Sequence, residues 1–311
     1  MRTLGVLLLT FLLPAAENLR ACSVCRCGDH SFFLNNARLL PAGRLLLGVD
    51  HLNTRKSAGV IHHDEHGQAL AKAVLPSTIH HEDPTLETQT QNAVQFNLKY
   101  GLATRVMLLA SVPYIFNRIA TDTGAETASG LGDPEMLAIA HLLNLGAWRL
   151  QGLAGARLPL GISDLEESPG VRREQHLQPG SGAWAGIFGV QLLQPSGRVP
   201  LFLSASYQAN GSNAHDFAYG NVFRFNVAAQ TALAGAFDLI AEVNGRMAEY
   251  DKDGAESDPN SGGTAVYFSP GLRLRLGAAS LRSQVQIPVI ENLHGGQNEK
   301  INLRTGLMWE L

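Results

Sequence analysis

The stretch AVQFNLKYGL, residues 93–102, decides the fold, because its apolar and polar side chains alternate strictly. Phe96 and Leu98 fall on one face of an extended chain, whereas Gln95 and Lys99 fall on the other. Successive side chains of a β-strand point to opposite faces, so this period of two predicts a strand with one apolar and one polar face.

The same alternation recurs through the rest of the chain, and helical periodicity does not compete with it. Many of the segments are longer than the usual soluble strand of about 5–6 residues. At about 3.3 Å per residue, a tilted strand of about 12 residues crosses a bilayer core of about 30 Å. We predict about twelve strands, near residues 43–54, 90–102, 104–117, 132–144, 147–161, 181–194, 200–210, 220–234, 237–250, 263–277, 280–290 and 299–311.

The connections between these segments alternate in length. Short turns near 103, 144–147, 195–198, 234–236 and 277–279 are interleaved with longer polar loops at 55–89, 118–131, 162–180, 211–219, 251–262 and 291–298. An even number of strands with short turns on one side and long loops on the other is typical of outer-membrane barrels. The sequence therefore predicts an all-β fold, a closed antiparallel transmembrane β-barrel over residues 43–311, with short periplasmic turns and longer extracellular loops. A soluble sandwich would share the alternation but would bury its apolar face.

The N-terminus predicts export. Arg2 precedes an apolar run at 4–16, which is typical of a signal peptide and too short for a membrane-spanning helix. We assign residues 1–21 to the signal peptide, 22–42 to a cysteine-containing periplasmic segment and 43–311 to the barrel. An outer-membrane location makes lipid and the barrel-assembly machinery the expected partners, and the sequence does not reveal the oligomeric state.

The composition fits this location. The chain has 311 residues, of which 45% are hydrophobic and only 16% charged, and its net charge is −3. Such a charge offers no basic footprint for nucleic acid. A mean hydropathy of zero is what two opposed faces give on average, one turned to lipid and one to the interior.

Three cysteines, Cys22, Cys25 and Cys27, lie in the segment 22–42. Three interpretations stay open: Cys22 is the acylated residue of a lipobox, the C-x2-C-x-C spacing forms a soft-metal clip, or the cysteines form a local disulfide with one spare thiol. The apolar cluster at 32–34 predicts that this segment tucks into the barrel as a small plug.

A second candidate metal site lies in the loop 55–89. Its histidines are interleaved with carboxylates in IHHDEHG and IHHEDP, and imidazole with carboxylate suits zinc or copper. The alternative is a solvated polar loop, and no other cofactor is expected. The candidate ligands here are His62, His63, His66, His80 and His81.

The polar faces of the predicted strands point into the barrel and carry many cations. The acids on the same faces are Asp50, Glu242 and Glu310. One interpretation is a pore that favours anions, because rings of like charge set selectivity. The other is a wall of Arg–Gln–Glu bonds that stiffens a closed barrel. The predicted pore-lining residues are Arg44, Lys99, Arg149, Arg157, Arg224, Glu242, Arg246, Arg273, Arg275, Arg282 and Arg304.

Four motifs carry a family resemblance: SVPYIFNR at 111–118, GLGDPEMLAIAHLL at 130–143, SYQANGSN at 206–213 and the final INLRTGLMWEL. With these, the chain resembles the Gram-negative outer-membrane transporter family grouped with the meta-pathway phenol-degradation proteins. The resemblance implies passage of small solutes, aromatic or hydrophobic, across the outer membrane, and it does not fix a substrate.

Some twelve-stranded outer-membrane barrels are enzymes. These phospholipases carry a His-x-Ser-Asn-Gly pattern on one strand. Here Ala209 occupies the position of the serine, and neither Gln208 nor the residue before it is a histidine. His215 follows in the next loop, but no base is evident on the strand to activate a serine. We predict that the chain is not an enzyme but a passive channel for small solutes that are anionic, aromatic or hydrophobic. A metal-binding outer-membrane protein is the first alternative, and a phospholipase-like enzyme is the second.

Overall fold

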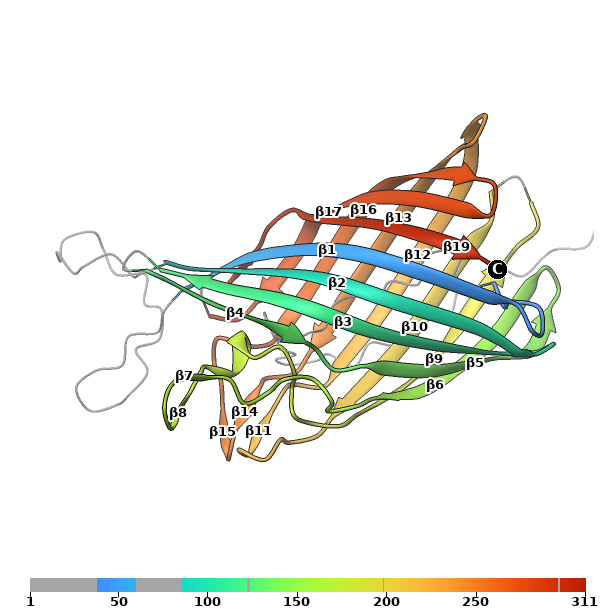
Figure 1. Ribbon diagram of the computed structural model, residues 1–311. Coiled ribbons are helices and arrows are strands. Elements are labelled where there is room, and N and C mark those ends of the chain that lie inside the picture. The colour runs from blue at the N-terminus through green and yellow to red at the C-terminus, as the bar shows by residue number, and fades with distance from the viewer. Residues whose placement is uncertain (1–37, 60–85, 122–123, 198, 296) are drawn as a thin grey trace, which may run out of the picture.

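The alternating segments pair with one another to form a closed barrel (Figure 1). The structure, a computed structural model, describes residues 38–59, 86–121, 124–197, 199–295 and 297–311. Each long strand pairs antiparallel with its neighbour in sequence, and β1 pairs with both β2 and β19, so the twelve long strands close into a ring. The fold is thus the predicted antiparallel barrel of twelve strands. These are β1 (Leu45–Gly59), β2 (Leu86–Ala103), β3 (Val106–Ala120), β5 (Glu135–Leu145), β6 (Trp148–Arg157), β9 (Ala185–Gln194), β10 (Leu201–Asn210), β12 (Val222–Ala234), β13 (Phe237–Ala248), β16 (Gly263–Leu276), β17 (Ala279–Leu293) and β19 (Asn302–Glu310).

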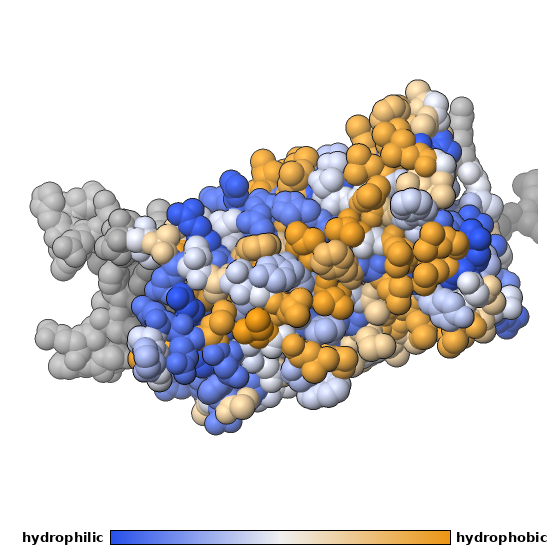
Figure 2. All heavy atoms as spheres, viewed as in Figure 1, coloured by the Kyte–Doolittle hydropathy of each residue, from blue (hydrophilic) through white to orange (hydrophobic). Residues whose placement is uncertain are grey.

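The exposure of the side chains is the reverse of that in a soluble protein. Lys99 and Gln151 are each only 2% exposed, whereas Phe96 is 54% and Leu239 42% exposed. In β3 and β5 the exposure changes at nearly every residue along the strand. Apolar side chains cover much of the barrel's outer surface, and polar ones gather toward its two ends (Figure 2). Such a surface belongs in lipid, so the fold and its outer face place the chain in the outer membrane and exclude the sandwich.

Short turns close one end of the barrel. Gly146, Gly235 and Gly277 have φ of 61°, 55° and 68° in the turns after β5, β12 and β16. Two-residue hairpin turns that match the twist of the strands need this left-handed conformation, which glycine adopts without steric cost. The C-terminus lies at the same end as these turns (Figure 1).

The other end carries small elements within segments that were predicted to be loops. A β7–β8 hairpin and a three-stranded sheet of β11, β14 and β15 gather there with the single turn of 3-10 helix η1 (Figure 1). The segment 118–131 is not a loop, because β4 pairs back along the outer part of β3. Among the described residues, no helix is long and apolar enough to cross a bilayer. The short elements are β4 (Ala125–Leu131), β7 (Glu166–Ser168), β8 (Val171–Arg172), η1 (Gln175–Leu177), β11 (Phe217–Ala218), β14 (Lys252–Asp253), β15 (Glu256–Ser257) and β18 (Asn298–Glu299).

Candidate functional site: the barrel interior

One part of the interior is a polar wall, built by the inward faces of β1, β2, β12, β13, β16, β17 and β19. Its centre is Glu242, which accepts hydrogen bonds from the side-chain amides of Asn226 and Gln284 at 2.7 and 2.8 Å. Ser269 donates to Asn244 at 2.8 Å beside them. These side chains are buried in the sheet interior, and each bond fixes an inward side chain.

Most of the predicted pore-lining arginines form ion pairs rather than a ring of uncompensated charge. Their partners include three buried carboxylates that the sequence analysis did not count: Glu135, Asp238 and Glu299. The pairs are Arg157–Glu135 at 3.5 Å, Arg282–Asp50 at 2.8 Å, Arg273–Asp238, in which Arg273 Nε donates at 2.9 Å, Arg275–Asp238 at 3.5 Å and Arg246–Glu299. With these three, the acids that face the ten predicted lining cations rise from three to six, so the expected excess of cations is smaller than predicted but remains.

Asp238 could have been found from the sequence. It is separated from Glu242 by four residues in the same strand, so period-two alternation places both on the same face. Glu135 and Glu299 both fall within segments predicted as strands, near their ends, where the inward face is hardest to assign from alternation.

The remaining predicted lining residues differ in their surroundings. Arg44 and Arg149 are exposed near the turn end, where Arg44 pairs with Glu310 at 3.3 Å. Arg224 donates to Gln208 at 2.9 Å, and Arg157 donates to the same amide oxygen at 3.2 Å. Gln208 thus bridges two arginines.

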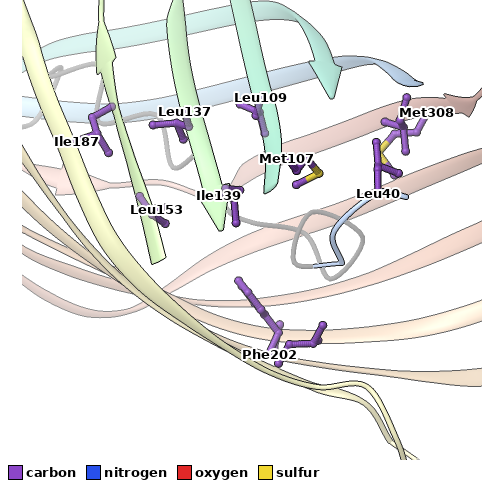
Figure 3. Close-up of a cluster of buried hydrophobic side chains, with 12 residues drawn as sticks. Leu40, Met107, Leu109, Leu137, Ile139, Leu153, Ile187, Phe202 and Met308 are labelled. Atoms are coloured by element: carbon purple, nitrogen blue, oxygen red, sulfur yellow. The ribbon is translucent and has the colours of Figure 1, made fainter. Parts of the chain in front are cut away.

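The other part of the interior is apolar, which the sequence analysis did not predict (Figure 3). Met107, Ile139 and Phe202 are fully buried, and neighbouring strands bring their side chains into one cluster. The signal was present in the sequence: the segment 135–143, EMLAIAHLL, is apolar at inward and outward positions alike. We call this cluster the apolar wall; its members are Leu40, Leu46, Met107, Leu109, Leu137, Ile139, Leu153, Ile187, Leu193, Phe202, Ala228 and Met308.

The end of the predicted plug segment reaches this wall. Leu40 is buried in the cluster and Leu39 packs against it. The chain then passes close to β2, where Gly101 accepts a hydrogen bond from the backbone of Gly43 at 2.8 Å. A Cβ at Gly101 would overlap the carbonyl of Pro41, so glycine is required for this approach. The rest of the segment 22–42, as far as residue 37, lies outside the described residues.

At the loop end, His176, Asp251 and Asp258 bring one nitrogen and two oxygens within 4.8 Å of one another. Burial raises the pKa of Asp251 to about 6. Burial by itself lowers the pKa of His176. The hydrogen bond to the Asp258 carboxylate and the charges of Asp251 and Glu174 outweigh this effect, so the pKa of His176 is raised. His176 Nε2 lies 3.9 Å from Asp258 Oδ2, and the nearby Lys56 adds a positive charge beside the two aspartates. This cluster is an ion-pair clasp that ties η1 to the β14–β15 loops.

The candidate metal ligands from the sequence cannot be compared with this arrangement. Cys22, Cys25 and Cys27 and the five histidines of the loop 55–89 lie outside the described residues. His215, weighed as a catalytic base, lies within 3.0 Å of Asp164 at an exposed loop position.

Comparisons with known proteins support the fold. No family model and no curated protein matches the chain, so the resemblance to the phenol-degradation proteins stays a prediction. Among solved structures, the COG4313 outer membrane channel from Pseudomonas putida F1 is similar with a TM-score of 0.63 at 14% identity, over 89% of this chain and 98% of that one. The β domain of the Bordetella autotransporter BrkA has a TM-score of 0.50 at 11% identity, over 87% of this chain and 100% of that one. At such identities the likeness establishes the outer-membrane barrel fold.

Proposed function

We propose that this chain is an outer-membrane channel for small solutes that carry an apolar, aromatic or aliphatic, group. The observation that carries the proposal is the division of the interior into a polar wall and an apolar wall. A barrel that passed only hydrated ions would gain nothing from fully buried Met107, Ile139 and Phe202 on its inner face. An amphipathic solute that entered the barrel, by contrast, would meet apolar side chains on one wall and hydrogen-bond partners on the other.

The ion pairs of the polar wall argue against a general anion pore. Rings of like charge set ion selectivity, but Arg157, Arg273 and Arg282 each face a carboxylate. The similar barrel from Pseudomonas putida F1 is described as an outer membrane channel, which supports the transport role for this fold.

The proposal is tested by solute flux into proteoliposomes containing the purified barrel, with protein-free vesicles as background. The solutes are glucose and phenyl β-D-glucoside, which share a sugar and differ by one aromatic ring. We expect phenyl glucoside to enter faster although it is larger. An aqueous pore would pass glucose faster, and that order would refute the proposal.

A matched pair of substitutions on β5 places the effect on the apolar wall. Ile139→Ser introduces a hydroxyl on the inner face, whereas Ala138→Ser introduces the same group at an exposed outer position one residue away. We expect Ile139→Ser to reduce the preference for phenyl glucoside several-fold and Ala138→Ser to leave it unchanged.

A further inference from the structure

Lys99 carries a buried side-chain amine that has no hydrogen-bond partner among the residues that the structure describes. Lys99 is 2% exposed, and its Nζ has no hydrogen-bond partner. A buried cation without a partner costs several kcal/mol, so proteins rarely retain one without use. None of the described residues supplies the acceptor that this group needs.

The nearest carboxylate is already committed elsewhere. Asp50 accepts two hydrogen bonds from Arg282, at 2.8 and 3.0 Å, and a third from the Asn97 amide at 2.9 Å. Lys99 feels the charges of Asp50, Arg282 and Arg304 together. Glu242 also acts on Arg282, but it is held by two amides of the polar wall. Asp50 and Glu242 are thus engaged by other side chains, and neither accepts a hydrogen bond from Lys99.

The surroundings of Lys99 on the barrel wall are apolar. In the strand register, Leu46 of β1 lies opposite Lys99 on one side and Leu109 of β3 on the other. Both leucines are buried and both belong to the apolar wall, as do Met107 of β3 and Leu40, which precedes β1. The amine is thus a single cationic point at the border between the apolar wall and the Asp50–Arg282 pair.

We propose that Lys99 is the anchor of a binding site for small amphipathic carboxylates, with the carboxylate at Lys99 and the aromatic or aliphatic body on the apolar wall. This deepens the proposed channel function and rests on it, because it names the solute class that the interior favours. A carboxylate supplies the missing acceptor together with a negative charge, and a charge-assisted hydrogen bond is about twice as strong as a neutral one. A neutral solute with the same body satisfies the apolar wall alone.

The test compares phenylacetate with phenylacetamide, which have the same ring and differ in the charge of the polar end. Binding to the full-length mature barrel in detergent is measured by calorimetry at pH 7.5. We expect wild-type protein to bind phenylacetate at least about tenfold more tightly, which corresponds to about 1.4 kcal/mol. Equal affinities for the two would overturn the proposal without any variant, because a water molecule at Lys99 would then account for the site.

Lys99→Met supplies the second arm, since it replaces the amine with a side chain of similar length that suits the apolar surroundings. The expected result is that phenylacetate binding falls to the level of phenylacetamide, while phenylacetamide binding is unchanged. The control is Lys252→Met, which changes an exposed lysine of β14 in the same way. A preference for phenylacetate that survives Lys99→Met would also overturn the proposal.

The two proposals fail in different ways. If phenyl glucoside entered vesicles no faster than glucose while phenylacetate still bound through Lys99, the channel function would fail and the site would stand. If phenyl glucoside entered faster but wild-type protein bound both ligands equally, the channel would stand and the carboxylate site would fail.

Discussion

Gly306 on β19 is the position where a single methyl group is expected to break the polar wall. It lies opposite Asp50 in the strand register. A Cβ built there would overlap Asp50 Oδ1 and lie 3.0 Å from Arg282 Nε. In Gly306→Ala the carboxylate must therefore move away, and its 2.8 Å contact with Arg282 is lost.

The magnitude follows from the burial of the pair. Asp50 and Arg282 are each about 3% exposed, and breaking a buried ion pair costs about 3–5 kcal/mol. Alanine recovers about 0.5–1 kcal/mol relative to glycine inside a strand. We expect Gly306→Ala to lower the free energy of unfolding by about 2–4 kcal/mol, measured by urea unfolding in lipid vesicles with tryptophan fluorescence.

Two comparisons make this expectation specific. Gly186→Ala on β9 adds the same methyl group at an exposed strand position with nothing within 4 Å, and it should be neutral or slightly stabilising. Asp50→Ala removes the group that the new methyl displaces, so adding Gly306→Ala to it should cost little more. Additive losses in the double variant, or a loss below about 0.5 kcal/mol in Gly306→Ala, would refute the reasoning.

Three further predictions concern other parts of the barrel. Val227→Arg places a charge on the exposed outer face midway along β12 and should lower the free energy of unfolding by about 2–4 kcal/mol, whereas Val227→Leu should not. Equal stability of the two variants in vesicle unfolding would mean that this face is not in lipid. Leu40→Ala shortens the side chain that packs on the apolar wall and should raise phenyl glucoside flux into vesicles; an unchanged rate would show that this contact does not obstruct passage. The pKa of Asp251 is raised to about 6 in the folded protein, so the folded protein keeps a proton on this carboxyl that the unfolded chain releases at lower pH. The contribution of Asp251 to the free energy of unfolding is therefore fully present below about pH 4 and is lost as the pH rises through about 6. Asp251→Asn should therefore reduce the loss of thermal stability between pH 5 and pH 8, and a wild-type stability that rises over this range would contradict it.

The barrel could be predicted from the sequence because its strands repeat one local rule. Alternation at 93–102 and 237–247 needs no knowledge of the partner strand, and glycines such as Gly235 mark the turns. The strand ends were less accurate, because pairing decides them: β1 continues to Gly59 and β17 to Leu293, beyond the predicted ends, where partner strands remain available.

The interior could be predicted only in part. The identity of inward residues such as Lys99 and Arg282 follows from alternation, but their pairing does not, because Asp50 and Arg282 are 232 residues apart in the chain. The apolar wall was missed because strands such as β5 are apolar on both faces, so alternation in hydrophobicity does not distinguish inside from outside there. Ion pairs and clusters depend on which strands become neighbours, and that is a property of the closed sheet.

In the proposed function, solutes with an apolar group bind along the apolar wall inside the barrel. The most direct measurement is a crystal structure of the protein soaked with 4-iodobenzyl alcohol, in which anomalous scattering locates the iodine. We expect the iodine to lie inside the barrel, against the apolar wall that contains Met107, Ile139 and Phe202. Iodine found only on the outer surface, or only along the polar wall around Glu242, would contradict it.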